Sequence, residues 1–347
     1  MNRREVNKML SLGVGGGLLG LSPMTLADRA FAQKGRVLDF QLLGYVLGIQ
    51  VPATAGIFEI LPSMPGYAQP TFARLNQIRV VTQTMVSGTA DIGDSDPPTV
   101  ISAVEAGADL KIVGKLYDKT SLVLVVNADR VKTIEDLAKP ETRVAISARG
   151  EIVHVMLVEP LLKRNLDFDS MTVIEMPGSG ARVSALLSDR IDAGNVHFDQ
   201  VAAIADQGNF KVLIEPWKEF DGWTNEVWVV RSEWLQDPDN ERALVDMLKA
   251  TLIAFRRAND DFDWYLEQYR KYATLKGASE ETAEHLRPIW ERLQSEIGAW
   301  PPDMNFTVAE LESLVPAYKA AGAIRGTVPI EDIVEPKYVQ QALEELG

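Results

Sequence analysis

The sequence predicts an α/β protein with two doubly wound sheets, a two-strand hinge and a helical C-terminal covering. Three observations lead to this prediction. Apolar, β-rich runs alternate with helix-length segments as far as Val230, only helical patterns follow Arg231, and two of the runs flank a small α/β unit of their own. The nine predicted strands are residues 36–43, 90–93, 110–116, 121–127, 143–147, 171–176, 190–196, 210–214 and 226–230.

The segment after Arg231 has the periodicity of amphipathic helices. Leu244, Leu248, Leu252 and Phe255 are spaced so that they fall on one face of a helix. Further apolar pairs continue the pattern and predict a helical covering for the sheets. These pairs are Trp264 with Leu266, Leu286 with Leu293, and Leu311 with Leu314.

The domain organisation follows from the two flanking runs, residues 121–129 and 225–233. Between them lies a complete strand–helix–strand unit, which predicts an inserted domain connected through two strands. We expect one lobe to comprise residues 33–125 and 226–347, and the inserted lobe to comprise residues 126–225. A pair of connecting strands of this kind acts as a hinge.

Composition limits the possible functions. The chain has 347 residues and a formal net charge of −14, without basic clusters, which argues against nucleic acids and anionic membranes as partners. It contains no cysteine, which excludes disulfides, thiol catalysis and cysteine-ligated zinc. His154 and His197 do not form a metal-binding pair of helical spacing. We therefore expect a small-molecule ligand and no cofactor or metal.

The N-terminus predicts export. Arg3, Arg4 and Lys8 precede an apolar, glycine-rich segment, and residues 30–32 read A-x-A. The arrangement resembles a twin-arginine signal, with Asn7 where a hydrophobic residue is usual. A short membrane anchor is the alternative, but the apolar part is shorter than the ~20 residues that a span needs. We expect a signal peptide over residues 1–32 and a soluble periplasmic protein.

The candidate ligand site comes from a rule of open α/β sheets, in which ligands bind at the carboxyl ends of the strands. Five loops of the predicted fold qualify, and both lobes contribute to them. Helices begin after three of these loops, and helix N-termini favour anionic oxygens. The candidate ligand-binding residues are Gly44, Tyr45, Asp94, Ser95, Asp96, Ser147, Arg149, Gly150, Gly178, Ser179 and His197, with Trp223 near the second crossing.

Three stretches of sequence, residues 87–114, 133–165 and 185–201, resemble the substrate-binding proteins of ABC importers in the sulfonate, taurine and nitrate class. The thiamine-pyrimidine-precursor binders belong to the same superfamily. Residues 330–347 are similar to the C-terminal helix of this family, whereas residues 61–85 depart from its pattern. The resemblance implies a type II periplasmic binding protein fold and a monomeric receptor that works with an inner-membrane ABC permease. It also implies that His197 lies in a pocket wall.

Ser95 has two interpretations. The run Gly93-Asp94-Ser95 is similar to the block that opens a lipase-like hydrolase family, but the later Asp-x-x-His of that family is missing. The sequence therefore favours a ligand cradle, in which Asp94 and Asp96 contact the ligand, cap the helix after Pro97, or do both.

The charge of the ligand is left open by the sequence. The guanidinium of Arg149 suits a carboxylate or sulfonate, which predicts an anion. Asp94, Asp96 and Glu151 favour a cationic or hydrogen-bond-donating group instead. A zwitterion or an amine-bearing heterocycle fits both sets of residues, and simple nitrate fits less well. A sulfonate, an organic acid or a nitrogen heterocycle therefore remains possible.

Aromatic side chains add a third feature to the predicted site. Tyr45, Trp223 and Trp228 either line a flat pocket or pack at the joint between the lobes. Together these features predict a receptor that binds a small organic solute by hinge closure and is not an enzyme. The alternative is a periplasmic enzyme on the same fold, either pyrimidine-forming or hydrolytic.

Overall fold

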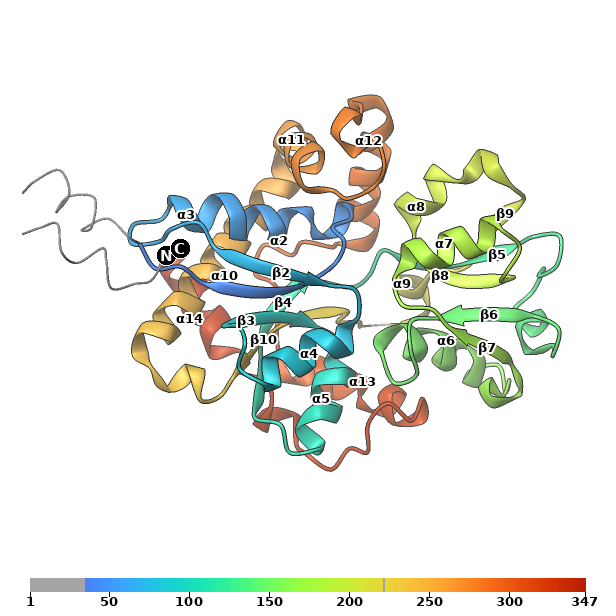
Figure 1. The fold of residues 1–347 in the computed structure, drawn as a ribbon, viewed down its shortest axis with the longest axis horizontal. Coiled ribbons are helices and arrows are strands. Elements are labelled where there is room, and N and C mark those ends of the chain that lie inside the picture. The colour runs from blue at the N-terminus through green and yellow to red at the C-terminus, as the bar shows by residue number, and fades with distance from the viewer. Residues whose placement is uncertain (1–34, 221) are drawn as a thin grey trace, which may run out of the picture.

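The computed structural model describes residues 35–220 and 222–347, in which two five-stranded sheets form the cores of two lobes (Figure 1). In the first lobe the strand order is β2-β1-β3-β10-β4, and in the second it is β7-β6-β8-β5-β9. The first sheet consists of β1 (Asp39–Leu43), β2 (Thr71–Leu75), β3 (Ile92–Ser95), β4 (Leu110–Tyr117) and β10 (Glu226–Arg231). The second consists of β5 (Leu122–Asn127), β6 (Arg143–Ile146), β7 (Thr172–Glu175), β8 (Ala193–His197) and β9 (Phe210–Ile214).

All nine strands predicted from the sequence are present, and β2 is an additional strand that the sequence did not predict. β2 is an edge strand whose first three residues are exposed, so it lacks the apolar signal of the other strands. Both sheets are mixed rather than parallel, because β10 runs antiparallel to β3 and β4, and β5 runs antiparallel to β8 and β9. These two strands follow the crossings between the lobes, and each enters its sheet from the end nearest the other lobe.

Helices cover the sheets of both lobes (Figure 1). In the described residues no helix is both long and apolar enough to cross a membrane. The first lobe carries α2 (Val51–Ala55), α3 (Leu61–Ser63), α4 (Ile78–Val86) and α5 (Pro97–Glu105); the second carries α6 (Ile152–Leu162), α7 (Ser179–Leu187), α8 (Phe198–Ala203) and α9 (Pro216–Glu219). The C-terminal part consists of α10 (Pro238–Asp260), α11 (Phe262–Tyr272), α12 (Ala283–Glu291), α13 (Val308–Ala320) and α14 (Lys337–Leu346).

The C-terminal part confirms the predicted helical covering. α10 begins at Pro238 after an Asp237 N-cap, whose side chain accepts a hydrogen bond from the backbone N–H of Asp239. The predicted apolar stripe of α10, from Leu244 to Phe255, is fully buried. This stripe and its neighbours pack α10 against α2, α11 and α14.

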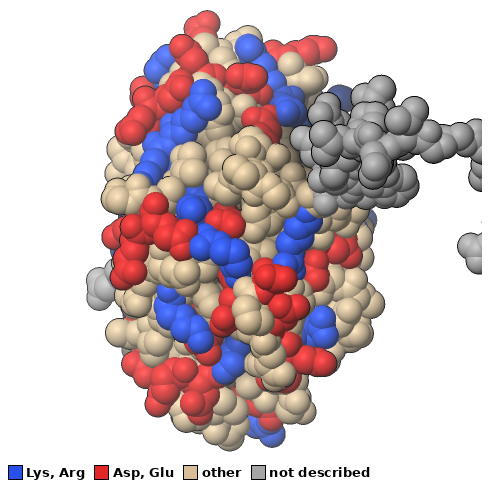
Figure 2. All heavy atoms as spheres, turned by 90° about the vertical axis from the view of Figure 1, so that its left-hand side faces the viewer, with Lys and Arg blue, Asp and Glu red and all other residues tan. Residues whose placement is uncertain are grey.

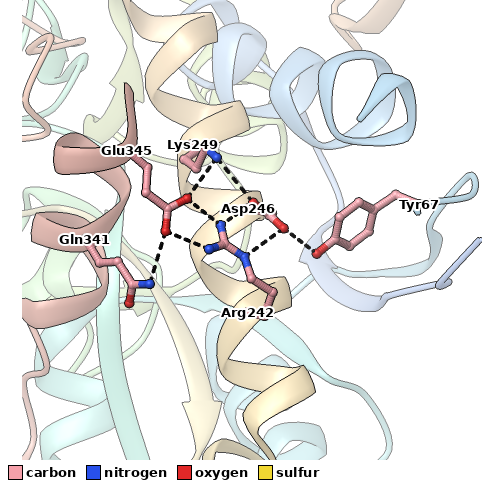
Figure 3. Close-up of polar contacts among 6 residues, drawn as sticks. All are labelled: Tyr67, Arg242, Asp246, Lys249, Gln341 and Glu345. Atoms are coloured by element: carbon pink, nitrogen blue, oxygen red, sulfur yellow. Dashed lines mark hydrogen bonds and ion pairs between the residues drawn. The ribbon is translucent and has the colours of Figure 1, made fainter. Parts of the chain in front are cut away.

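A surface network fastens α14 to α10 (Figure 3). Arg242 donates to Glu345 at 2.6 Å and 2.8 Å, and Lys249 reaches the same carboxylate at 3.0 Å. These cations, led by Arg242, lower the pKa of Glu345 to about 2. Tyr67 donates to Asp246 at 2.9 Å and thereby adds the segment before β2 to the network.

The charges on this side of the molecule are mixed. Figure 2 shows basic and acidic side chains interspersed over the visible part of the face that lies on the left in Figure 1. Extended fields of one sign favour nucleic acids or membranes, and mixed charges do not.

The chain crosses between the lobes in two short segments, residues 118–121 and 222–225. Lys119 and Thr224 form a parallel bridge between these segments, and the backbone N–H of Lys119 donates to the carbonyl of Trp223 at 3.1 Å. β5 lies in the second sheet and β10 in the first. The crossings are therefore the short segments next to these strands rather than the strands themselves.

A buried lysine ties both crossing segments to the first lobe. Lys115 on β4 donates to Asp118 at 2.7 Å and to Glu310, at the start of α13, at 2.6 Å. Glu310 also accepts a hydrogen bond from Thr224 at 3.0 Å. The side chain of Lys115 is completely buried, so this cluster is a fixed point at the base of both crossings.

The signal peptide predicted for residues 1–32 lies outside the described residues.

Candidate functional site

The predicted loops meet where the two lobes face each other, and they enclose two small cavities. The first, with a volume of about 30 Å³, is lined by residues of both lobes. The second, of about 10 Å³, lies behind it within the first lobe, and Tyr45 lines both. By this measure a single water molecule needs about 10–15 Å³, so the first cavity is far too small for an organic solute and the closed lobes must part to admit one. The first cavity is lined by Leu43, Tyr45, Asn76, Gln77, Ile78, Leu122, Ser147, Glu151, Ile152, Val153, Pro177, Gly178, Arg182, Asn225 and Glu226.

The Asp94–Ser95–Asp96 run ends β3 at the interface. Both carboxylate oxygens of Asp94 lie 3.0 Å from the backbone nitrogen of Leu43 and share its N–H in one bifurcated hydrogen bond, which joins the ends of β3 and β1. Asp96 caps α5 by accepting a hydrogen bond from the backbone N–H of Thr99 at 2.8 Å, so the predicted capping role is confirmed. The Ser95 hydroxyl lies 2.7 Å from the hydroxyl of Thr82. Its hydrogen-bond partner in the described residues is this threonine and not a histidine.

Two carboxylates reach across the interface to backbone amides of the opposite lobe. Asp96 accepts a hydrogen bond at 2.8 Å from the backbone N–H of Ile152, the first residue of α6. Asp199, in the second lobe, accepts one at 3.2 Å from the backbone N–H of Gly48 in the first. The N-terminus of α6, where the sequence predicted a ligand anion, therefore already faces the carboxylate of Asp96.

Burial shifts the protonation of the acidic groups in this region. Desolvation raises the pKa of Asp94 and of Asp96 to about 7 and that of Glu226 to about 8. Asp94 and Asp96 raise the pKa of Glu226 further by repulsion. Burial also raises the pKa of Glu151. The closed cleft thus holds carboxyl groups that retain protons near neutral pH.

Arg182 is the buried cation of the site, and sequence reasoning missed it. Its Nε donates to the carbonyl of Asn195 at 2.6 Å, and its Nη1 donates to the carbonyl of Met176 at 2.8 Å. Burial lowers the pKa of Arg182 to about 10, so it stays charged at neutral pH. Arg182 lies one turn inside α7, where a helical pattern alone does not separate a buried arginine from an exposed one.

Glu226 was missed for a different reason. It is the first residue of β10, a strand that the sequence analysis assigned to the hinge rather than to the site. Its carboxylate accepts a hydrogen bond from Gln50 at 3.3 Å. A charged residue at the start of a strongly apolar strand was the available sequence signal.

Several predicted residues do come together at the interface. Tyr45, Ser147 and Gly178 line the first cavity, and Asp94 lines the second. Gly44 lies beside them, where a side chain would begin 2.3 Å from the amide oxygen of Asn76.

Ser179 and His197 are buried in the wall of the second lobe. The Nδ1 atom of His197 lies 2.6 Å from the Ser121 hydroxyl, and its ring packs edge-on to Tyr45 with centroids 6.0 Å apart. Burial lowers the pKa of His197 to about 3, so it is neutral.

Three predicted residues lie elsewhere. Arg149 is 52% exposed, lies over the ring of Phe168 and pairs with Asp169 at 3.5 Å. With Gly150 it lines an outer groove of about 630 Å³, to which α4 and α5 of the first lobe also contribute, whereas Asp96 accepts the hydrogen bond from the first amide of α6. Trp223 is buried against Phe220, with ring centroids 4.4 Å apart, and its indole N–H donates to Asn225, so its role here is packing.

The raised pKa values predict that ligand-free protein loses stability as the pH rises from 6.5 to 8.5. In this window the folded protein keeps protons on Asp94, Asp96 and Glu226 that the unfolded chain, with ordinary carboxyl pKa values, has lost. We expect the free energy of unfolding to fall by about 2–4 kcal/mol, measured by urea denaturation at pH 6.5, 7.5 and 8.5.

A Glu226→Gln variant serves as the control, because it should lose less stability over the same window than the wild type. His154 and His197, whose pKa values burial lowers to about 4 and about 3, act in the opposite direction only below their ordinary pKa of about 6.5. A free energy that is flat or rises with pH in both proteins would contradict the assignment.

In the described part of the chain, no three histidine or acidic side chains lie close enough together to hold a metal ion. The site therefore consists of hydrogen-bonding and charged side chains that two closed lobes bring together.

The protein has the two-lobed type II periplasmic binding protein fold. Each lobe is built on a mixed α/β sheet, and the candidate site lies between the lobes. Residues 76–258 match the model of the NMT1/THI5 like family, more than half of the chain, and the chain therefore belongs to that family. The resemblance seen in the sequence is thereby confirmed. No curated protein matches the sequence.

Solved structures support the fold. The ligand-binding component of an ABC-type import system from Staphylococcus aureus, with zinc bound, is 13% identical with a TM-score of 0.72, covering 88% of this chain and 99% of that chain. The alkanesulfonate-binding protein SsuA from Xanthomonas axonopodis pv. citri, bound to MOPS, is 16% identical with a TM-score of 0.68, and the match covers 87% of this chain and 99% of that chain. The periplasmic nitrate-binding protein NrtA from Synechocystis PCC 6803 is 11% identical with a TM-score of 0.70, and the match covers 90% of this chain and 89% of that chain.

Proposed function

We propose that the protein is the solute-binding component of an ABC importer, which closes around a small organic molecule and delivers it to an inner-membrane permease. The observation that carries this proposal is the interlobe cavity, where buried polar groups from both lobes face a space that no side chain fills. The family and the fold of the similar import proteins support it.

The proposed motion is a rotation of the lobes about the two crossing segments, residues 118–121 and 222–225. Ligand binding favours closure to the extent that the ligand contacts both lobes in the closed form and only one in the open form. In the closed structure Asp96 and Asp199 already link the lobes through backbone amides. We place the lobe boundaries at these segments rather than at residues 125 and 226.

The proposed role is binding without chemistry. Ser95 pairs with Thr82, and Asp94 and Asp96 accept backbone hydrogen bonds, so none of the three is arranged as a nucleophile with its base. We further propose that the mature protein is a periplasmic monomer, exported through the signal at residues 1–32.

A thermal-shift screen tests the receptor role. We expect a true solute at a hundred times its Kd to stabilise the protein by about 2.7 kcal/mol and to raise Tm by roughly 5 °C or more. Chromatography of the mixture should recover the solute unchanged. Conversion of the stabilising solute would favour the alternative, an enzyme on the same fold.

A further inference from the structure

The interlobe site contains more acidic than basic side chains. Carboxyl groups reach it from the end of β3, the start of β10 and the start of α6, whereas its deeply placed cations are two arginines. All four carboxyl groups are buried and come from both lobes. The acidic residues are Asp94, Asp96, Glu151 and Glu226, and the arginines are Arg74 and Arg182, with Arg79 at the outer edge 3.8 Å from Glu151.

Hydrogen bonds within the protein compensate only part of the negative charge that these carboxyl groups carry when they are ionised. Asp94 and Asp96 accept backbone hydrogen bonds, whereas Glu226 is paired with neutral groups, the amide of Gln50 at 3.3 Å and the phenol of Tyr117. Arg182 directs its Nε and Nη1 to backbone carbonyls rather than to a carboxylate. When these carboxyl groups are ionised, the negative charges of the site therefore outnumber its buried cations.

An independent observation points to a missing hydrogen-bond partner. The Ser147 side chain lines the first cavity and is 7% exposed, and its hydroxyl, which lies near Glu151, has no hydrogen bond of good geometry. Buried hydroxyl groups are rarely left unpaired, because desolvation without a partner costs free energy. Ser147 faces the same cavity as Glu151 and Glu226.

Two other kinds of ligand group fit less well. An anion cannot use the N-terminus of α6, where the carboxylate of Asp96 accepts the amide hydrogen bond, and beside Arg182 it would meet the carboxyl groups of Glu151 and Glu226. A metal ion needs several converging ligands, and the described residues contain no such group. A group with several N–H donors satisfies carboxylates that are spread along a cavity wall.

We propose, on the basis of the receptor function proposed above, that the transported solute carries a protonated nitrogen, an ammonium or amidinium group, bound between Glu226, Glu151 and Ser147. The positive charge offsets the acidic excess, and its N–H groups donate to both carboxylates and to the Ser147 hydroxyl. Because Glu226 belongs to the first lobe and Glu151 to the second, this one group holds both lobes in the closed arrangement.

Binding of such a cation has a signature in proton uptake and release. Burial raises the pKa values of Asp94, Asp96 and Glu226 to about 7, 7 and 8. A cation beside them favours the ionised forms, so protons leave as it binds. Affinity should therefore rise with pH between 6.5 and 8.5, in the direction opposite to the stability of the ligand-free protein.

The test uses solutes that share a carbon skeleton and differ in charge. Methylammonium, butylammonium and benzylammonium are compared with butanol, benzyl alcohol, butyrate and benzoate at equal ionic strength. Calorimetric titration in two buffers of different ionisation enthalpy reports both affinity and proton release. The proteins are wild type, Glu226→Gln, and Glu141→Gln as a control that changes an exposed carboxylate in the second lobe.

We expect the amines to bind with release of protons and to bind at least ten times more tightly than their alcohols. Glu226→Gln should weaken the amines at least tenfold and Glu141→Gln should leave them unchanged. The charge inference is overturned if a carboxylate binds better than the amine of the same skeleton, or if Glu226→Gln binds amines as the wild type does. An anionic solute that binds would leave the receptor function standing, whereas a protein stabilised by no solute of any charge would contradict both proposals.

Discussion

Replacing Lys115 by methionine is expected to lower the free energy of unfolding by about 3–5 kcal/mol. The Lys115 ammonium is completely buried and hydrogen-bonds to Asp118 and Glu310, so its removal leaves two carboxylates without their cation. Burial already raises the pKa of Glu310 despite this pairing. Urea denaturation at pH 7.5, followed by circular dichroism, measures the loss.

The same strand offers a matched control for this variant. Lys111 on β4 is partly exposed, at 23%, and lies 3.8 Å from Glu335. Lys111→Met should therefore cost at most about 1 kcal/mol. Similar losses for the two variants would show that the cluster around Lys115 does not anchor the crossing segments.

The second large effect is expected at Arg182. Arg182→Met removes the buried guanidinium and leaves the carbonyls of Met176 and Asn195 without these donors, at a cost of about 2–4 kcal/mol. Because the two carbonyls follow β7 and lie in β8, the change also loosens the wall of the cavity. Urea denaturation measures the loss of stability. Calorimetric titration shows whether the loosened wall lowers solute affinity or the loss of a positive charge beside a cationic solute raises it.

Arg149→Met is the control for Arg182→Met. The sequence predicts Arg149 as the anion contact, but in the structure its side chain is half-exposed and faces the outer groove. Its replacement should change stability by less than about 0.5 kcal/mol and leave solute affinity unchanged. A loss of affinity at Arg149 with none at Arg182 would favour the anion interpretation instead.

Most of the fold could be predicted because its signals are local. β5 and the centre of β10 are continuous apolar runs, β4 is mostly apolar, and the stripe from Leu244 to Phe255 has the period of a helix, so each element is visible within its own segment. β2 was not predicted, because an edge strand with exposed residues lacks the apolar pattern of the other strands. The direction of β5 and β10 depends on where the chain crosses between the lobes, which no local pattern records.

The sequence predicted the candidate site through one rule, that ligands bind at the carboxyl ends of strands in open α/β sheets. The carboxyl ends of strands led to the Asp94–Asp96 run, Tyr45, Ser147 and Gly178, which the structure places at or beside the two cavities, since the rule concerns the backbone. It does not say which side chains turn inward once the lobes close. Arg182 and Glu226 enter the site through contacts between distant segments, and these contacts exist only in the folded protein.

Closure around a solute can be measured directly, because the chain has no cysteine and two can be introduced without interference. Ser87→Cys at the end of α4 and Ser188→Cys at the end of α7 place spin labels on exposed positions of opposite lobes. Electron double resonance then gives the distribution of distances between them. We expect ligand-free protein to include distances longer than that of the closed structure, and a stabilising solute to collapse the distribution onto the closed value. A distribution that stays the same, open or closed, when a stabilising solute saturates the protein would contradict the proposal that the receptor binds by closing.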